Sequence, residues 1–184
     1  KEAMNTMQIG GLVRLIKKIV LVTIIFELLG ALLLSIRYIP LYGVGQGIWL
    51  SIFHSISAFC NAGFDLMGIN SANSSLSLFV GDPLVNIVII VLVIIGGIGF
   101  IVWNDISEHK FHIKKYQLHT KMILFGTLFM VFVGTTLFAI IEWNHAFRDF
   151  DVSTKLLASL FSSVTPRTAG FSTVDMSTYS ASGS

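Results

Sequence analysis

Three long apolar segments divide the chain. Residues 12–34, 84–103 and 122–141 are each close to the roughly 20 residues that an α-helix needs to cross a bilayer core. The second and third contain no Asp, Glu, Lys or Arg, and between Ile19 and Ile36 the first carries only Glu27. This pattern predicts three membrane-spanning helices.

A fourth uncharged segment, 41–60, is long enough to span but is unusually polar. The basic residues form one group before the first span and another between the second and third: Lys1, Arg14, Lys17 and Lys18, then Lys110, Lys114, Lys115 and Lys121. The positive-inside rule places both groups in the cytoplasm, so an even number of crossings must separate them. Segment 41–60 therefore enters from outside and returns, with a short pore helix at about 46–59.

A near-repeat supports this re-entrant interpretation. Ser-Ala-Phe-Cys-Asn-Ala-Gly-Phe ends at Phe64, and Val-Thr-Pro-Arg-Thr-Ala-Gly-Phe ends at Phe171, so Ala-Gly-Phe recurs after 107 residues. A serine lies eight residues before each glycine, Ser55 and Ser162. A second pore helix is expected at about 153–164, with Ser153 as its cap.

The predicted fold is an all-α membrane protein built from span–pore-loop–span repeats with extended, carbonyl-lined filter turns. We expect a cytoplasmic lead-in at 1–11, a complete repeat at 12–104, a basic cytoplasmic loop at 105–121 and an incomplete repeat at 122–184. The filter turns are 60–64 and 167–171. With no initiator methionine or signal peptide, the chain is expected to be a fragment of a longer protein.

Composition agrees with a membrane protein and argues against an enzyme. Only 12% of residues are charged and mean hydropathy is +0.80, whereas soluble domains carry about 25% charge. The single cysteine, Cys60, excludes an intrachain disulfide framework. We find no catalytic triad, phosphate-binding loop or zinc-ligand pattern, and expect no cofactor in this chain.

The repeated turns suggest a cation filter. Non-helical backbone is tolerated at membrane depth where protein buries it or it lines a watery cavity, and rings of carbonyl oxygens can replace the hydration shell of K⁺. The pore helices end just before the turns, and their negative C-terminal ends favour a cation. The candidate carbonyl donors are Cys60, Asn61, Ala62, Gly63, Arg167, Thr168, Ala169 and Gly170. A ring takes four such segments, and two are present here.

These two loops resemble the second and third pore loops of the Trk/Ktr/HKT superfamily of potassium transporters. The segments that carry the resemblance are Phe53–Phe64 and Ser163–Phe171, and the nearest likeness is to bacterial membrane subunits of the KtrB and TrkH type. It implies four repeats in one polypeptide, each giving one filter glycine; Gly63 and Gly170 match two. It also implies a plasma-membrane homodimer with one pore per chain, gated by a cytosolic KtrA/TrkA-like ring that binds a nucleotide (ATP, ADP or NAD).

Several residues near the filter have two interpretations. For Arg167 we favour a role in tying filter-backing carbonyls over a repulsive gating role. For His54 we favour a buried, hydrogen-bonded ring over a pH sensor or pore contact. For Glu27 we favour hydrogen bonds from a pore loop over ion coordination. Phe64 and Phe171 are expected to pack behind the filter.

Two further segments are also ambiguous. Gly96, Gly97 and Gly99 interrupt the second span. We favour a role in close helix packing; the alternative is a hinge used in gating. The basic loop at 105–121, which contains three histidines, faces anionic lipid headgroups or the regulatory ring.

The favoured function is that of the membrane subunit of a K⁺ uptake system, with Na⁺ as a candidate second ion. An ion-coupled secondary transporter with broken helices is one rival, but it predicts inverted repeats, whereas both units here run in the same direction. A non-conducting membrane scaffold is the other, and it gives no reason for the repeated glycine turn.

Overall fold

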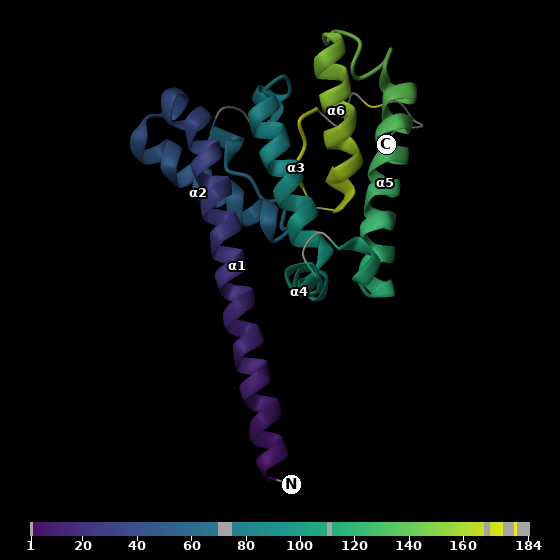
Figure 1. Cartoon of the computed structure of the whole chain (residues 1–184). Helices are drawn as coiled ribbons and strands as arrows, with labels where there is room; N and C mark the ends of the chain where they lie inside the picture. Colours follow the sequence, from purple (N-terminus) through teal and green to yellow (C-terminus); the bar gives the residue numbers. More distant parts are fainter. Residues whose placement is uncertain (1, 70–74, 110–111, 168–169, 175–178, 180–184) are drawn as a thin grey trace.

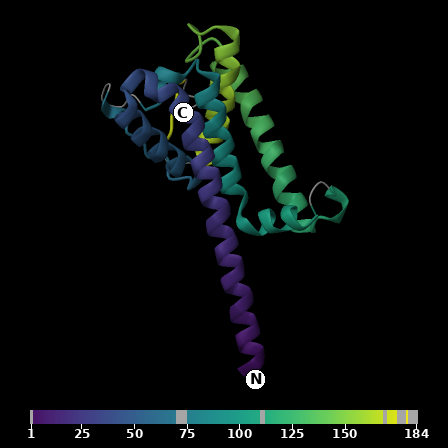
Figure 2. The ribbon, with the colours of Figure 1, turned by 60° about the vertical axis from the view of Figure 1, so that its left-hand side comes forward.

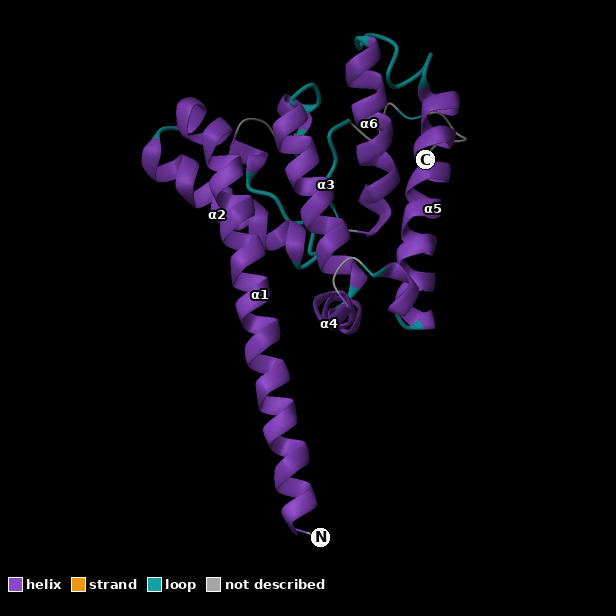
Figure 3. Ribbon diagram, in the orientation of Figure 1, coloured by secondary structure: helices purple, strands orange, loops and turns teal. Residues whose placement is uncertain are grey.

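Helices account for nearly all of the regular structure. The computed structural model describes residues 2–69, 75–109, 112–167, 170–174 and 179, with side chains from Val13 onward. Its α-helices are α1 (Glu2–Tyr42), α2 (Val44–Phe59), α3 (Pro83–Ile98), α4 (Phe100–His109), α5 (Leu118–Glu142) and α6 (Val152–Val164). Short 3₁₀ turns lie at Met67–Ile69, Ser77–Phe79, Ile113–Lys115 and Thr165–Arg167. No strand occurs in these ranges, which confirms the all-α prediction (Figure 3).

Two helix hairpins form the framework. The first joins α1 to α2 through Gly43, whose φ of 80° is unfavourable for other residues. Gly47 then lets α2 approach α1, because a Cβ there would lie 2.7 Å from the Cα of Ile39. In the second hairpin α6 packs along α5 (Figure 1).

The first helix is longer than the apolar segment 12–34. It continues to Tyr42 because its outer end has its own packing: Tyr38 is fully buried. Arg37 also pairs with Asp82 at 2.8 Å. Asp82 caps α3 by accepting from the backbone N–H of Leu84 at 3.0 Å.

The segment 84–103 is not one straight helix. Helices α3 and α4 meet at a 93° bend at Gly99, where φ is 89°. The indole of Trp103 in α4 donates to the carbonyl oxygen of Ile95 in α3 at 3.0 Å, which ties the bend together. In Figure 2 α4 runs across the base of the bundle toward α5.

Within the described residues, two helices are long and apolar enough to cross a membrane: Val13–Tyr42 and Leu118–Glu142. The bent pair α3–α4 provides a third if it is counted as one span.

The cap of α6 differs from the sequence expectation. Asp151, two residues before the predicted Ser153, caps the helix and accepts from both the backbone and the hydroxyl of Ser153. These hydrogen bonds lower the pKa of the Asp151 carboxyl.

Candidate ion-filter site

The first filter turn begins where α2 ends. The N–H groups of Asn61 and Ala62 donate to the carbonyls of Ala58 and Ser57 at 3.1 and 2.9 Å, with Asn61 in the left-handed region at φ 54°. This is the Schellman pattern that ends a helix and satisfies its last carbonyls. The chain then leaves the helix in an extended form.

Two side chains of α2 hold this extended segment. The hydroxyl of Ser57 donates to the carbonyl oxygen of Phe64 at 2.6 Å, and the backbone N–H of Leu66 donates to Nε2 of His54 at 3.4 Å. Gly63, directly before the first anchored residue, has φ 73°. Within the described part of the chain, no hydrogen-bond donor pairs with the carbonyl oxygens of residues 60–63. These oxygens therefore remain available to a ligand.

His54 contacts both loops. It is fully buried, and its Nδ1 lies 2.7 Å from the carbonyl oxygen of Leu50. A neutral ring with its proton on Nδ1 satisfies this contact and the one from Leu66. The same ring lies 6.1 Å from that of Phe171 in the second loop. This arrangement fits the buried, hydrogen-bonded interpretation.

The two predicted filter glycines meet in space. A Cβ built on Gly170 would lie only 2.7 Å from the carbonyl oxygen of Gly63. Residues 107 positions apart in the sequence are thus in direct backbone contact. Thr168 and Ala169, the other candidate carbonyl donors around Gly170, lie outside the described residues.

The two filter phenylalanines have different surroundings. Phe171 is 1% exposed and belongs to the main core. Phe64 is 70% exposed and lines an outward groove with Trp49 and Phe53 of α2. In the described part of the chain Phe171 is buried, as expected for a residue that packs behind the filter, whereas Phe64 is exposed and does not match that expectation.

A matching serine contact fixes each pore helix to its span. The Ser55 hydroxyl donates to the backbone carbonyl of Glu27 at 2.6 Å, and the Ser163 hydroxyl donates to that of Val131 at 3.0 Å. In each span a glycine three residues later faces the serine: a Cβ on Gly30 would collide with Ser55, and one on Gly134 with Ser163. Both hairpins thus use the same device in the same chain order.

The spatial counterpart of Ser55 is therefore Ser163. Counting back eight residues from each glycine predicts Ser162 instead, but its hydroxyl is within 2.8 Å of that of Tyr179. The second loop reaches its glycine one residue sooner than the first, which accounts for the difference.

Glu27 contributes its side chain to the same region. Its Oε1 accepts a weak hydrogen bond from the Cys60 thiol at 3.8 Å. Backbone and side chain of Glu27 therefore both accept from the first pore loop, as the favoured interpretation expects.

The glycines of α3 adjoin the filter from behind. A Cβ on Gly96 would collide with the carbonyl oxygen of Phe59, the last residue of α2. One on Gly97 would lie 3.6 Å from Oδ1 of Asn61 and 3.9 Å from Nη1 of Arg167. Close packing at Gly96 and Gly97 and the bend at Gly99 are thus separate features of one glycine cluster. Arg167 lies at this packed face.

Comparison with known proteins assigns the family. A family model described as "TrkH: Cation transport protein" matches residues 1–184, the whole chain. The chain belongs to the TrkH cation transport family.

Relatives of this TrkH-family chain include proteins from three bacteria. The Ktr system potassium uptake protein B of Bacillus subtilis (strain 168) is 44% identical over 177 residues, covering 95% of the chain and 38% of the relative. The potassium/sodium uptake protein NtpJ of Enterococcus hirae is 41% identical, with the same coverages. The Ktr system potassium uptake protein B of Vibrio alginolyticus is 39% identical, covering 97% and 39%. The chain thus spans about two fifths of their length.

Membership of the TrkH family confirms the resemblance seen in the two loops. The family comprises membrane transporters and not enzymes, and the chain is a multi-pass membrane protein of this bacterial type. The contacts missed from sequence are the Ser163–Val131 and His54–Leu66 hydrogen bonds. Gly134 in the middle of a span was the available signal for the first.

Proposed function

We propose that the protein takes up K⁺ through a backbone-carbonyl filter to which this chain contributes two of four segments. The donors are the carbonyls of Cys60–Gly63 in the first segment and of residues 167–170 in the second. The transported ion is a substrate, and no covalent chemistry is involved. The contact between Gly63 and Gly170 carries this proposal.

The surroundings of the two glycines support a filter over an ordinary turn. The helix-ending hydrogen bonds of Asn61 and Ala62 hold the backbone before Gly63, and Ser57 and His54 hold it after Gly63, while in the described chain no donor pairs with the carbonyls of residues 60–63. Such preformed, unpaired oxygens suit a cation that must lose its water. The C-terminal end of α2 adds a favourable negative potential.

The matching serine contacts favour direct repeats. In both hairpins the order is span carbonyl, span glycine, pore-helix serine. Inverted-topology repeats would keep this chain order but would start the second unit from the opposite side of the membrane, whereas α1 and α5 here both follow a basic segment. Four direct repeats around one axis would complete the ring.

The remaining features of the proposed system follow from the relatives. Two carry the name of a Ktr system; from the family resemblance we infer a homodimer whose pores are gated by a cytosolic nucleotide-binding ring. One is named a potassium/sodium protein, so Na⁺ is included in the test below.

The experiment is uptake of K⁺ and Na⁺ by the whole protein in cells that lack other potassium uptake. We expect Gly63→Ser to lower the K⁺-over-Na⁺ preference, because its φ of 73° strains any side chain beside the carbonyls. Gly43→Ser is the matched control: φ is also positive, at 80°, but no atom lies within 4 Å of its Cβ position. Equal selectivity in the two variants would contradict the filter assignment.

A further inference from the structure

A second cavity lies between the N-terminal half of α1 and the crossing helix α4. Its volume is about 280 Å³ and its lining is almost wholly apolar. The walls include Leu15, Ile19, Val22 and Phe26 from α1, with Phe100 and Trp103 from α4. None of these residues belongs to the filter.

The bend at Gly99 creates this cleft. A helix that turns by 93° from a span lies nearly parallel to the membrane plane, and Figure 2 shows α4 crossing the base in this way. By the positive-inside rule this end of the bundle faces the cytoplasm. The cleft therefore opens at the depth of the inner lipid leaflet.

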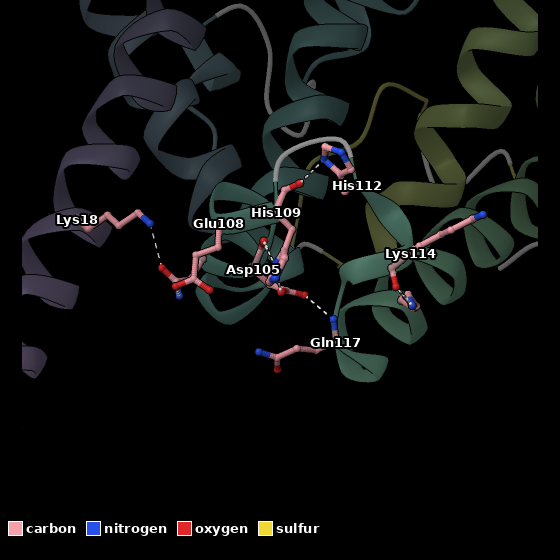
Figure 4. Close-up of polar contacts among 9 residues, drawn as sticks. Lys18, Asp105, Glu108, His109, His112, Lys114 and Gln117 are labelled. Carbon is pink, nitrogen blue, oxygen red and sulfur yellow. Dashed lines mark hydrogen bonds and ion pairs between the residues drawn. The ribbon is translucent and has the colours of Figure 1, made fainter.

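The rim of the cleft is basic. Lys18 reaches across it and donates to Oδ1 of Asn104 at 3.0 Å (Figure 4). Arg14, one helical turn before Lys18 on the same side of α1, is exposed, and Lys17 is exposed on the opposite side of α1. In the described part of the chain, none of these three cations has a carboxylate oxygen within 4.0 Å. An anion would therefore compensate them.

The nearest buried carboxylate is already engaged. Asp105 accepts from the backbone N–H of Gln117 at 2.9 Å and contacts Nδ1 of His109 at 3.0 Å (Figure 4). It ties α4 to the start of α5, and in the described residues it forms no ion pair with the basic side chains of α1.

We propose that this cleft binds one anionic phospholipid of the inner leaflet. An acyl chain lies against Val22, Phe26 and Trp103, and the phosphate lies between Arg14 and Lys18. An apolar wall with a cationic rim matches a lipid of that kind better than a zwitterionic one, since basic residues near a membrane surface attract anionic headgroups.

The occupied cleft would contact the base of the pore helix. The ring of Phe26 lies 5.2 Å from that of Trp103 and 6.2 Å from that of Phe59, the last residue of α2. A bound acyl chain thus supports the aromatic stack that ends at the first filter turn.

The test uses the whole protein in phosphatidylcholine vesicles containing either brominated phosphatidylglycerol or brominated phosphatidylcholine. Bromine quenches nearby indoles, and Trp103→Phe identifies the contribution of Trp103. We expect stronger quenching by phosphatidylglycerol. Arg14→Gln and Lys18→Gln should each weaken that preference by about fivefold, whereas Lys121→Gln, whose ammonium binds the Lys114 carbonyl, should keep it.

Val22→Phe provides an independent variant, because it narrows the cleft without changing a charge; we expect it to reduce quenching by both lipids. Equal quenching by the two lipids in the unaltered protein would overturn the anionic assignment. An absence of quenching would overturn lipid binding altogether and indicate that another part of the protein fills the cleft. Neither readout requires transport, so the result is separable from the filter proposal.

Discussion

Replacing Gly170 with alanine would insert a methyl group between the two filter segments. The new Cβ would lie 2.7 Å from the carbonyl oxygen of Gly63, whereas carbon–oxygen contacts of this kind usually lie at about 3.3–3.6 Å. One backbone must therefore move by roughly 0.6–0.9 Å. No flexible side chain is available to absorb the shift, because the obstructing atom is a main-chain oxygen.

The magnitude follows from the cost of overpacking. Adding one carbon to a tightly packed site costs about 1–3 kcal/mol. If that cost falls on the K⁺-bound filter, the K⁺-over-Na⁺ preference decreases by roughly five- to 150-fold. The total amount of folded protein should change much less, since the serine contacts that position both pore helices are untouched.

The assay is competitive rubidium uptake by the whole protein, with Na⁺ as competitor, normalised to the protein in the membrane. Gly45→Ala is the matched control because it lies in the same kind of pore loop with open space at its Cβ position. If Gly170→Ala retained the selectivity and rate of Gly45→Ala, the contact between the two glycines would have no part in ion selection.

Three further predictions concern side chains that hold the helices in place. Ser163→Ala should lower the free energy of unfolding by about 1 kcal/mol through loss of its bond to Val131, measured by thermal unfolding in detergent; no change would refute the contact. Asp82→Ala should cost about 1–2 kcal/mol because α3 loses its cap, whereas Arg37→Gln should cost less than about 1 kcal/mol, since Arg37 is 52% exposed; equal losses would contradict this. The pKa of Asp105 is lowered by the neighbouring Thr120 hydroxyl and by hydrogen bonds from Gln117 and His109, so its stabilisation is present above its unfolded pKa of about 3.9 and disappears as pH falls through the lower folded pKa. Asp105→Asn should therefore flatten the acid limb of a stability–pH curve, and an unchanged limb would refute this role.

Hydropathy and charge placement were sufficient to predict the helical class, the long apolar helices and the two short helices before the glycine turns. These features depend on local composition, which the sequence states directly. The end of α1 was harder to predict: its last turns contain a charge at Arg37 and a proline at Pro40, and only packing of Tyr38 and pairing of Arg37 with Asp82 explain why the helix continues.

The contacts between helices were difficult to predict from sequence for a similar reason. The glycines near the end of α3 suggested either close packing or a hinge. The sequence alone could not assign one role to each glycine, because neighbouring glycines have different roles. Gly96 meets the carbonyl of Phe59, while Gly99 makes the bend. Equal spacing from the glycine predicted Ser162 as the counterpart of Ser55 in the second loop. The structure shows that Ser163 makes the corresponding contact with the span.

The position of His54 has a consequence for how the filter can evolve. One imidazole accepts a hydrogen bond from the extended segment that follows Gly63 and contacts the ring of Phe171 from the other loop. Substitutions in either loop therefore alter a shared neighbour, and their effects on selectivity should not simply add. A substitution in one loop that moves this ring is therefore expected to be tolerated best when the other loop accommodates the movement.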